Sequence, residues 1–225
     1  MTSGTFLTFD CYGTLVDWET GIVEACRAAA AADGVTLDRE TVLRVHAEVE
    51  PAVQAERFRS YRDVLIEVAH AIGRAAGWTL SRERAAFLPE SLPQWPPFPE
   101  TNGALRALAR RGHPLGVLSN VDDALLAGTL DQLAVRFDLL VTAEQVRSYK
   151  PAIAHFERAR RHVGARDWLH VAQSWFHDIA PAHALGIPAV WINRKGETPV
   201  GDAAPLAEVP TLAAFVEWLE RGQRP

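Results

Sequence analysis

An aspartate follows directly after a short apolar run near the N-terminus. Asp10 comes after residues 6–9, and the turn-forming Gly13 lies three positions further on. An apolar run of this length is typical of a buried strand, and the carboxyl ends of parallel strands form the ligand-binding edge of an open sheet. A carboxylate held there away from water can act as a nucleophile. The sequence therefore makes Asp10 the first candidate for a catalytic residue.

Three further polar segments each follow a predicted strand. They are Ser119-Asn120, Lys150-Pro151 and residues 173–178, which end at Asp178. Each alone has an ordinary explanation, because Ser-Asn pairs form turns and an isolated Asp, Asp10 included, often ends a strand or caps a helix. Their shared position after strands predicts that they converge with Asp10 at one edge of the sheet.

The elements that would position these residues fall into two regions. Residues 18 to about 97 predict helices only, over 20–32, from the capping Asp38 towards 49, and over 61–76. The proline cluster at 93–99 predicts a stiff extended connector. The rest alternates short apolar strands with helices, which is typical of a buried parallel sheet with right-handed crossovers.

This alternation predicts an α/β fold. The expected strands are 5–9, 114–118, 137–141, 169–172 and 189–192, and the expected helices include 101–111, 122–133, 152–163 and 211–221. We expect a Rossmann-like parallel sheet core formed by residues 1–16 and 98–225. Residues 17–97 would be an inserted all-helical cap that excludes water from the strand tips.

The four segments resemble, in order, the four motifs of the haloacid dehalogenase (HAD) superfamily, and most closely those of its type II 2-haloacid dehalogenase branch. The phrases that carry the resemblance are Phe9-Asp10-Cys11-Tyr12-Gly13-Thr14-Leu15, Leu118-Ser119-Asn120, Ser148-Tyr149-Lys150-Pro151 and residues 186–194. The phosphatases of the superfamily have D-x-D-x-T in the first motif. Here the second acid is replaced by Tyr12, as in the dehalogenase branch.

The resemblance implies a role for each motif residue. Asp10 would be the nucleophile, Lys150 would supply positive charge that keeps Asp10 ionised, and Asp178 would serve the hydrolytic step. The other implied contacts are with the substrate or the Asp10 carboxylate. They involve Thr14, Ser119 and Asn120 through their side chains, Cys11 and Tyr12 through backbone amides, and Trp175 and Tyr12 as pocket walls. His177 would donate to a leaving group or position water, although a hydrogen-bonded loop histidine and a core Trp175 are equally good interpretations.

The implied reaction is hydrolysis of a short 2-haloalkanoic acid to the 2-hydroxy acid through an aspartyl ester on Asp10. A halide leaves without protonation, which explains why an acid at position 12 can be lost. No metal and no cofactor are expected. Magnesium prefers several carboxylate oxygens, whereas Tyr12 and Gln173 stand where the phosphatases carry acids.

Some features depart from the branch. Its S-x-N-x-x-D pattern before Asp178 is replaced by Gln173 and Trp175, and no Arg-Gln pair for the leaving halide is visible. These changes resemble a divergent subgroup. The candidates for a halide contact are Arg44, Arg57, Arg59 and Arg62. The alternatives are a metal-dependent HAD phosphatase, an Asp-nucleophile hydrolase of another small electrophile, and a scaffold that has lost catalysis.

Composition excludes several partners. The 225 residues carry a net charge of -5, so no surface charge favours nucleic acid or an anionic membrane. No apolar run is long enough to span a bilayer, and the N-terminus lacks signal-peptide features. Cys11 and Cys26 are too few for a disulfide framework. We therefore expect a cytoplasmic enzyme, as a homodimer, whose partner is a small halogenated carboxylic acid.

Overall fold

The chain forms two compact units in a computed structural model that describes residues 4–222. The α/β unit comprises the described residues up to Val16, Pro97–Ser119 and those from Leu133 onward. The helical unit comprises Asp17–Pro96 and Asn120–Gln132. The first unit carries the strands, and the second is built from helices and their connections.

A six-stranded parallel sheet forms the centre of the α/β unit, in the order β3-β2-β1-β4-β5-β6. Its strands are β1 (Phe6–Phe9), β2 (Leu115–Ser119), β3 (Leu139–Thr142), β4 (Trp168–Ala172), β5 (Ala189–Ile192) and β6 (Ala207–Val209). The order reverses between β1 and β4, the place where open sheets of this kind bind ligands. The predicted α/β fold with a parallel sheet is confirmed.

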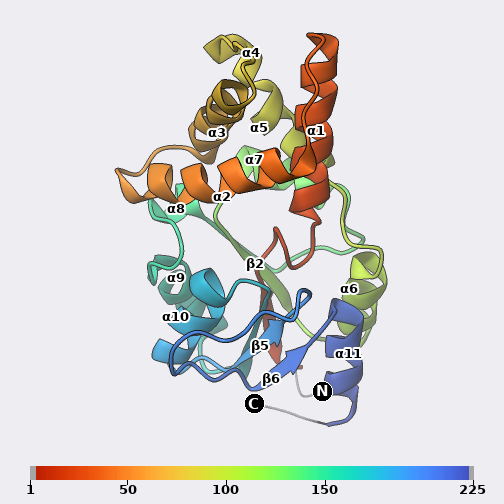
Figure 1. Cartoon of the computed structure of the whole chain (residues 1–225). Helices are drawn as coiled ribbons and strands as arrows, with labels where there is room; N and C mark the ends of the chain where they lie inside the picture. The colour runs from red at the N-terminus through yellow and green to blue at the C-terminus, as the bar shows by residue number, and fades with distance from the viewer. Residues whose placement is uncertain (1–3, 223–225) are drawn as a thin grey trace. The chain divides into compact units, whose positions relative to one another are not determined.

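Helices cover both faces of this sheet. The helices of the α/β unit are α6 (Thr101–Arg110), α8 (Ala143–Val146), α9 (Ala154–Val163), the π-helix η2 (Trp175–Ile179), α10 (Ala180–Ala184) and α11 (Leu212–Glu220). The helices α6 and α11 lie on one face, and α9 and α10 on the other (Figure 1). Because both faces are covered, every residue of β1, β2, β4 and β5 is buried, which explains their continuous apolar runs.

The helical unit follows the predicted pattern in its first three helices. Its elements are α1 (Trp18–Ala32), α2 (Arg39–Ala55), α3 (Tyr61–Ala75), α4 (Arg82–Ala85), α5 (Phe87–Ser91), the 3-10 helix η1 (Leu92–Gln94) and α7 (Asp123–Leu130). Side-chain caps begin the long ones, since Asp17, Asp38 and Ser60 accept hydrogen bonds from backbone N–H groups three residues ahead. The connector at 93–99 is only partly extended, because η1 occupies its first residues. No helix within 4–222 combines the length and the apolar character needed to cross a membrane.

The segment Asn120–Gln132 differs from the predicted domain boundaries, which placed it with the sheet. The carboxylate of Asp122 accepts hydrogen bonds from the backbone N of Tyr61 and of Arg62, both at 2.8 Å, and so satisfies the first turn of α3. The side-chain amide of Gln132 donates to two backbone carbonyls of the proline-rich segment, at 2.6 and 3.0 Å. These contacts join residues far apart in sequence, and a local pattern does not encode them. That the helical unit acts as a cap stays a prediction.

Candidate active site

The turn after β1 folds back on the carboxylate that ends the strand. Asp10 is only 7% exposed, and its Oδ2 accepts a hydrogen bond of 2.8 Å from the hydroxyl of Thr14. The turn closes through the carbonyl of Cys11, which accepts from the backbone N of Leu15 and Val16. Gly13 has φ of 98°, a conformation that glycine adopts without strain. The spacing D-x-x-G-T therefore serves to bring Thr14 onto Asp10.

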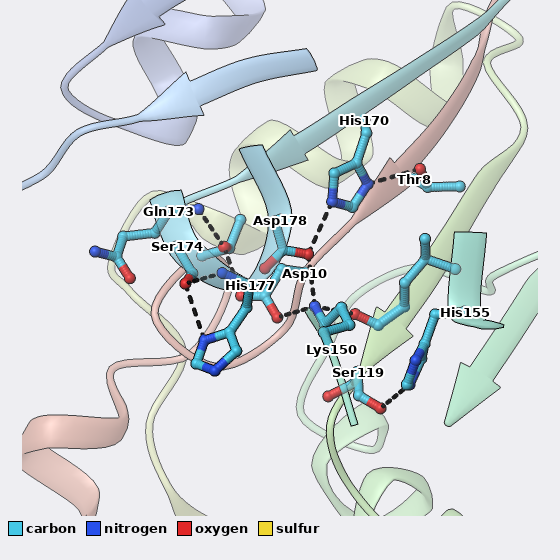
Figure 2. Close-up of polar contacts among 12 residues, drawn as sticks. Thr8, Asp10, Ser119, Lys150, His155, His170, Gln173, Ser174, His177 and Asp178 are labelled. Carbon is cyan, nitrogen blue, oxygen red and sulfur yellow. Dashed lines mark hydrogen bonds and ion pairs between the residues drawn. The ribbon is translucent and has the colours of Figure 1, made fainter. Parts of the chain in front are cut away.

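Lys150 joins Asp10 to Asp178. Its ammonium donates to Asp10 Oδ1 at 3.0 Å, to Asp178 Oδ1 at 2.6 Å and to the carbonyl of Leu118 at 2.9 Å, as Figure 2 shows for the two carboxylates. Lys150 is 2% exposed and Asp178 is fully buried. An ammonium has three donors, so it can serve all three of these acceptors at once. Lys150 thus joins one carboxylate that lies 140 positions away in sequence and another that lies 28 positions away, and the three residues form one buried charge cluster, as predicted from their places after strands.

The two carboxylates differ in acidity although they share one cation. Burial would raise the pKa of Asp178, but the charge of Lys150 and a hydrogen bond from His170 outweigh it and lower this pKa to about 2. At Asp10 burial wins, and its pKa is raised in spite of Lys150 and Thr14, with the charge of Asp178 adding to the rise. The charge of Lys150 lowers the pKa of Asp10, the direction that its predicted role requires, and that role stays a prediction. Lys150 acts in that direction, but desolvation is larger. Desolvation also acts against the charge of Lys150, yet the two carboxylates raise the pKa of its ammonium.

The effect of Asp178 on the pKa of Asp10 can be measured without a substrate. Asp178→Asn should lower the pKa of Asp10, because it removes a negative charge that opposes ionisation and leaves Lys150 to Asp10 alone. In a pH titration followed by the ¹³C shift of the Asp10 carboxyl carbon, ionisation should begin at lower pH in the variant. Asp202→Asn, which removes an exposed carboxylate of the same unit, should leave the titration unchanged. An Asp10 pKa that stays or rises in Asp178→Asn would contradict the assigned coupling.

Ser119 ends β2 but does not hold Asp10. Its side chain is fully buried, and its Oγ has no hydrogen-bond partner among the described residues, while its carbonyl contacts His155 Nε2 at 3.2 Å. Burial and the charge of Lys150 lower the pKa of His155 to about 3, so this imidazole is neutral and Nε2 is the donor. Ser119 was predicted to contact either the Asp10 carboxylate or the substrate. Contact with the substrate stays a prediction. Asn120 belongs to the helical unit, and its role also stays a prediction.

The segment after β4 is a π-helix, a feature often found at functional sites. It buries Asp178 completely while Phe176 is 63% exposed. Ser174 begins it, since its Oγ accepts from the backbone N of His177 at 3.1 Å and contacts Nδ1 of the same residue at 3.0 Å (Figure 2). His177 is therefore hydrogen-bonded within its own turn, one of its two predicted interpretations. A role for it towards a leaving group or water stays a prediction.

Trp175 lines a cavity that does not include the charge cluster. Its ring packs on Trp191 with centroids 4.8 Å apart, and its Nε1 donates to the carbonyl of Val200 at 2.8 Å. The cavity has a volume of about 570 Å³. Its lining residues are Gln173, Ser174, Trp175, Phe176, Ala180, Glu197, Thr198 and Val200. Neither Asp10 nor Tyr12 is among them, so this cavity gives no support to Trp175 as a wall beside the nucleophile.

Cys11 and Tyr12 are the remaining residues of the first motif with a predicted role. Cys11 is fully buried, and desolvation together with the charge of Asp10 raises the pKa of its thiol well above the usual value, which makes it a packed side chain rather than a nucleophile. Tyr12 is half-buried and forms a short bridge with Val16. The predicted use of the backbone amides at Cys11 and Tyr12 stays a prediction.

Two polar residues that the sequence reasoning did not single out belong to the site. His170, in the middle of β4, contacts Asp178 Oδ1 through Nε2 at 3.0 Å and Thr8 Oγ1 through Nδ1 at 2.9 Å. Thr8 lies in β1, opposite His170 in the strand pairing. Both are fully buried. A Thr and a His inside otherwise apolar, buried strands were the signal that could have revealed them, because buried polar groups need partners.

The described residues contain no cluster of three or more His, Cys, Asp or Glu side chains arranged to hold a metal ion. The ammonium of Lys150 lies between the two carboxylates instead.

Comparisons with known proteins identify the family of the sequence. A family model described as haloacid dehalogenase-like hydrolase matches residues 6–186. Haloacetate dehalogenase H-2 of Moraxella sp. (strain B) is 30% identical over 200 residues, covering 84% of this chain and 86% of that protein. Phosphoglycolate phosphatase of Rhodospirillum rubrum is 29% identical over 217 residues, covering 94% and 89%.

A solved structure extends the comparison to the fold. The crystal structure of an L-2-haloacid dehalogenase superposes with a TM-score of 0.82 at 25% identity, covering 97% of this chain and 100% of that one. A buried Asp at the tip of β1, a Lys that pairs it with a second Asp after β4, and a family model over most of the sequence lead to one conclusion. The chain is a hydrolase and belongs to the haloacid dehalogenase-like family.

Proposed function

We propose that the chain hydrolyses the carbon-halogen bond of a short 2-haloalkanoic acid and releases the 2-hydroxy acid. One observation carries the proposal. The Lys150 ammonium contacts Asp10 and Asp178 together, at 3.0 and 2.6 Å, so that a cation provided by the protein lies between the two carboxylates. The named relative, a haloacetate dehalogenase, supports the substrate class.

The first half-reaction forms an ester. An oxygen of the Asp10 carboxylate attacks C2 of the substrate, the carbon-halogen bond breaks with its electron pair, and C2 is inverted. Thr14 and Lys150 each hold one carboxylate oxygen and so orient the nucleophile. Burial that raises the pKa of Asp10 also leaves its carboxylate poorly solvated and therefore more reactive towards carbon.

The second half-reaction returns the enzyme to its starting state. Water attacks Cγ of the Asp10 ester, with Asp178 as the acceptor of its proton. Once Asp10 is esterified its negative charge is lost, and Lys150 then pairs with Asp178 alone. The product keeps an oxygen that came from Asp10, and the oxygen of water becomes part of the regenerated carboxylate.

The phosphatase alternative requires different residues. When a phosphate ester is hydrolysed, the leaving group is an alkoxide, which needs a proton donor. The phosphatase motif has an acid for this purpose, and in this chain that position is Tyr12. Magnesium would need hard oxygen ligands, but the ammonium of Lys150 already lies between the two carboxylates that could supply them. The expected cytoplasmic location, the homodimer and the residue that contacts the halide stay predictions.

Halide release from a panel of 2-halo acids tests this function. Each single-enantiomer acid should yield halide and 2-hydroxy acid in equal amounts, with the same rate in EDTA and in added magnesium, because Lys150 supplies the cation. The same preparations should release no phosphate from p-nitrophenyl phosphate. Asp10→Asn, purified in parallel, controls for contaminating activity. Phosphate release that EDTA abolishes and magnesium restores, without halide release, would establish the phosphatase instead.

A further inference from the structure

A buried row of polar side chains extends from the sheet to the charge cluster. The indole Nε1 of Trp168 donates to Thr8 Oγ1 at 2.8 Å, Thr8 Oγ1 contacts His170 Nδ1 at 2.9 Å, and His170 Nε2 contacts Asp178 Oδ1 at 3.0 Å. Figure 2 shows the last two contacts on the side of Asp178 away from Lys150. Thr8, His170 and Asp178 are fully buried.

The chemistry of these groups fixes the direction of each hydrogen bond. An indole N–H only donates, so Thr8 Oγ1 is its acceptor. The carboxylate of Asp178 only accepts, so His170 Nε2 carries a hydrogen; Nδ1 of a neutral imidazole is then an acceptor, and the Thr8 hydroxyl donates to it. His170 therefore donates to Asp178, whose carboxylate can only accept.

The two oxygens of Asp178 are in different situations as a result. Oδ1 accepts from both Lys150 and His170, at 2.6 and 3.0 Å. Oδ2 is buried and accepts no hydrogen bond from the described residues. A buried carboxylate oxygen without a partner is uncommon and costly, which points to a ligand in the working enzyme.

We propose that His170 is a positioning residue for ester hydrolysis: its Nε2–H holds Oδ1 of Asp178, so that Oδ2 is the oxygen that accepts the proton of the attacking water. This inference rests on the proposed two-step function. Thr8 acts on His170 in turn: its hydrogen bond to Nδ1 favours the tautomer in which Nε2 carries the hydrogen.

The proton balance of the step is complete with these groups. As the water oxygen bonds to Cγ of the Asp10 ester, one water proton passes to Asp178 Oδ2. The bond from Cγ to the alkyl oxygen then breaks, and that proton goes to the leaving alkoxide, which becomes the 2-hydroxy acid. The second water proton leaves as the new Asp10 carboxyl group ionises beside Lys150.

A merely structural network would affect stability without distinguishing between the two half-reactions. The rings of Phe156 and His170 form a T-shaped contact with centroids 5.2 Å apart, and this contact carries no hydrogen bond to Asp178. Phe156→Leu is therefore a matched control, because it loosens the packing around the same imidazole. Thr8→Ser keeps the hydroxyl that Thr8→Val removes, and this pair tests the tautomer.

The experiment measures both half-reactions in single turnovers of the full chain with a 2-halo acid. Halide appearance reports ester formation, and loss of the ester mass adduct reports hydrolysis. His170→Leu should slow hydrolysis about ten- to a hundredfold, the scale of a lost hydrogen bond to a charged group, and change ester formation less than about threefold. Thr8→Val should slow the same step by a smaller factor, with recovery in Thr8→Ser. Phe156→Leu should leave the ratio of the two rates unchanged.

Equal slowing of both steps in His170→Leu and Thr8→Val, or unchanged hydrolysis in both, would overturn the inference. If His170→Leu does not fold, the Thr8 pair decides. A readout independent of activity is the ¹⁵N shifts of the His170 ring, which should show a neutral imidazole with hydrogen on Nε2. Hydrogen on Nδ1 would refute the positioning role even if the enzyme is active. Absence of halide release from an enzyme with the expected tautomer would refute the proposed function instead.

Discussion

Replacing Asp10 by Asn should abolish halide release, with a loss of about a thousandfold or more, the scale seen when a nucleophile is removed. An amide oxygen carries no full negative charge and cannot displace a halide at a useful rate. The protein should stay folded, because Lys150 keeps its contact with Asp178 at 2.6 Å. Single-turnover halide release and a thermal unfolding curve, measured on the same preparation, check both statements.

Asp17→Asn is the matched control for this loss. Asp17 lies two residues after the first motif, but its carboxylate accepts from the backbone N of Thr20 at 3.1 Å and begins α1. Its replacement should reduce stability by at most about 1 kcal/mol and leave halide release within a few-fold of the parent. Substantial halide release by well-folded Asp10→Asn would show that another group attacks the substrate.

Lys150 and Asp178 should control different half-reactions. Asp178→Asn should slow ester hydrolysis about a hundredfold or more, because the buried proton acceptor is lost, and the ester should accumulate as an increase in intact protein mass. Lys150→Met keeps the length of the apolar stem but leaves two buried carboxylates without a cation. One of them then takes up a proton, so ester formation should slow by about a hundredfold or more, with no adduct.

Intact-mass spectra taken through a single turnover separate these outcomes. Lys195→Met, an exposed lysine of the same unit, is the control and should match the parent in both steps. Removing one partner of a buried charge cluster costs about 3–5 kcal/mol, so unfolding curves accompany the Lys150 variant. Adduct in Lys150→Met and none in Asp178→Asn would reverse the two roles.

The charge cluster could be predicted because Asp10 and Asp178 each follow a buried strand, and Lys150 follows β3 after the short helix α8. In a parallel sheet the strand ends share one edge, so Asp10, Lys150 and Asp178 had to come close once the apolar runs were identified as strands. The three long helices of the helical unit could be predicted as well, since their apolar residues recur at helical spacing. Asp17, Asp38 and Ser60 cap them.

Other features depend on long-range packing and left little local signal. The strand β6 has three residues, at the edge of the sheet, and only Val209 is buried. Asn120–Gln132 is grouped with the helical unit through contacts to residues about 40 to 60 positions earlier. The raised pKa of Asp10 results from burial in three dimensions, which the sequence predicts poorly. His170 was overlooked because a single polar residue in a strand has no distinctive spacing.

A single turnover in ¹⁸O-water, with enzyme in excess over a 2-halo acid, tests the central claim most directly. If the Asp10 carboxylate attacks the substrate and water then cleaves the ester, the heavy oxygen enters the Asp10 side chain. The first 2-hydroxy acid released then contains none of it. Mass spectrometry of the peptide that contains Asp10, and of the product, reads both sites. Label that enters the product in the first turnover and leaves Asp10 unlabelled would mean that water attacks C2 itself, and would contradict Asp10 as the nucleophile.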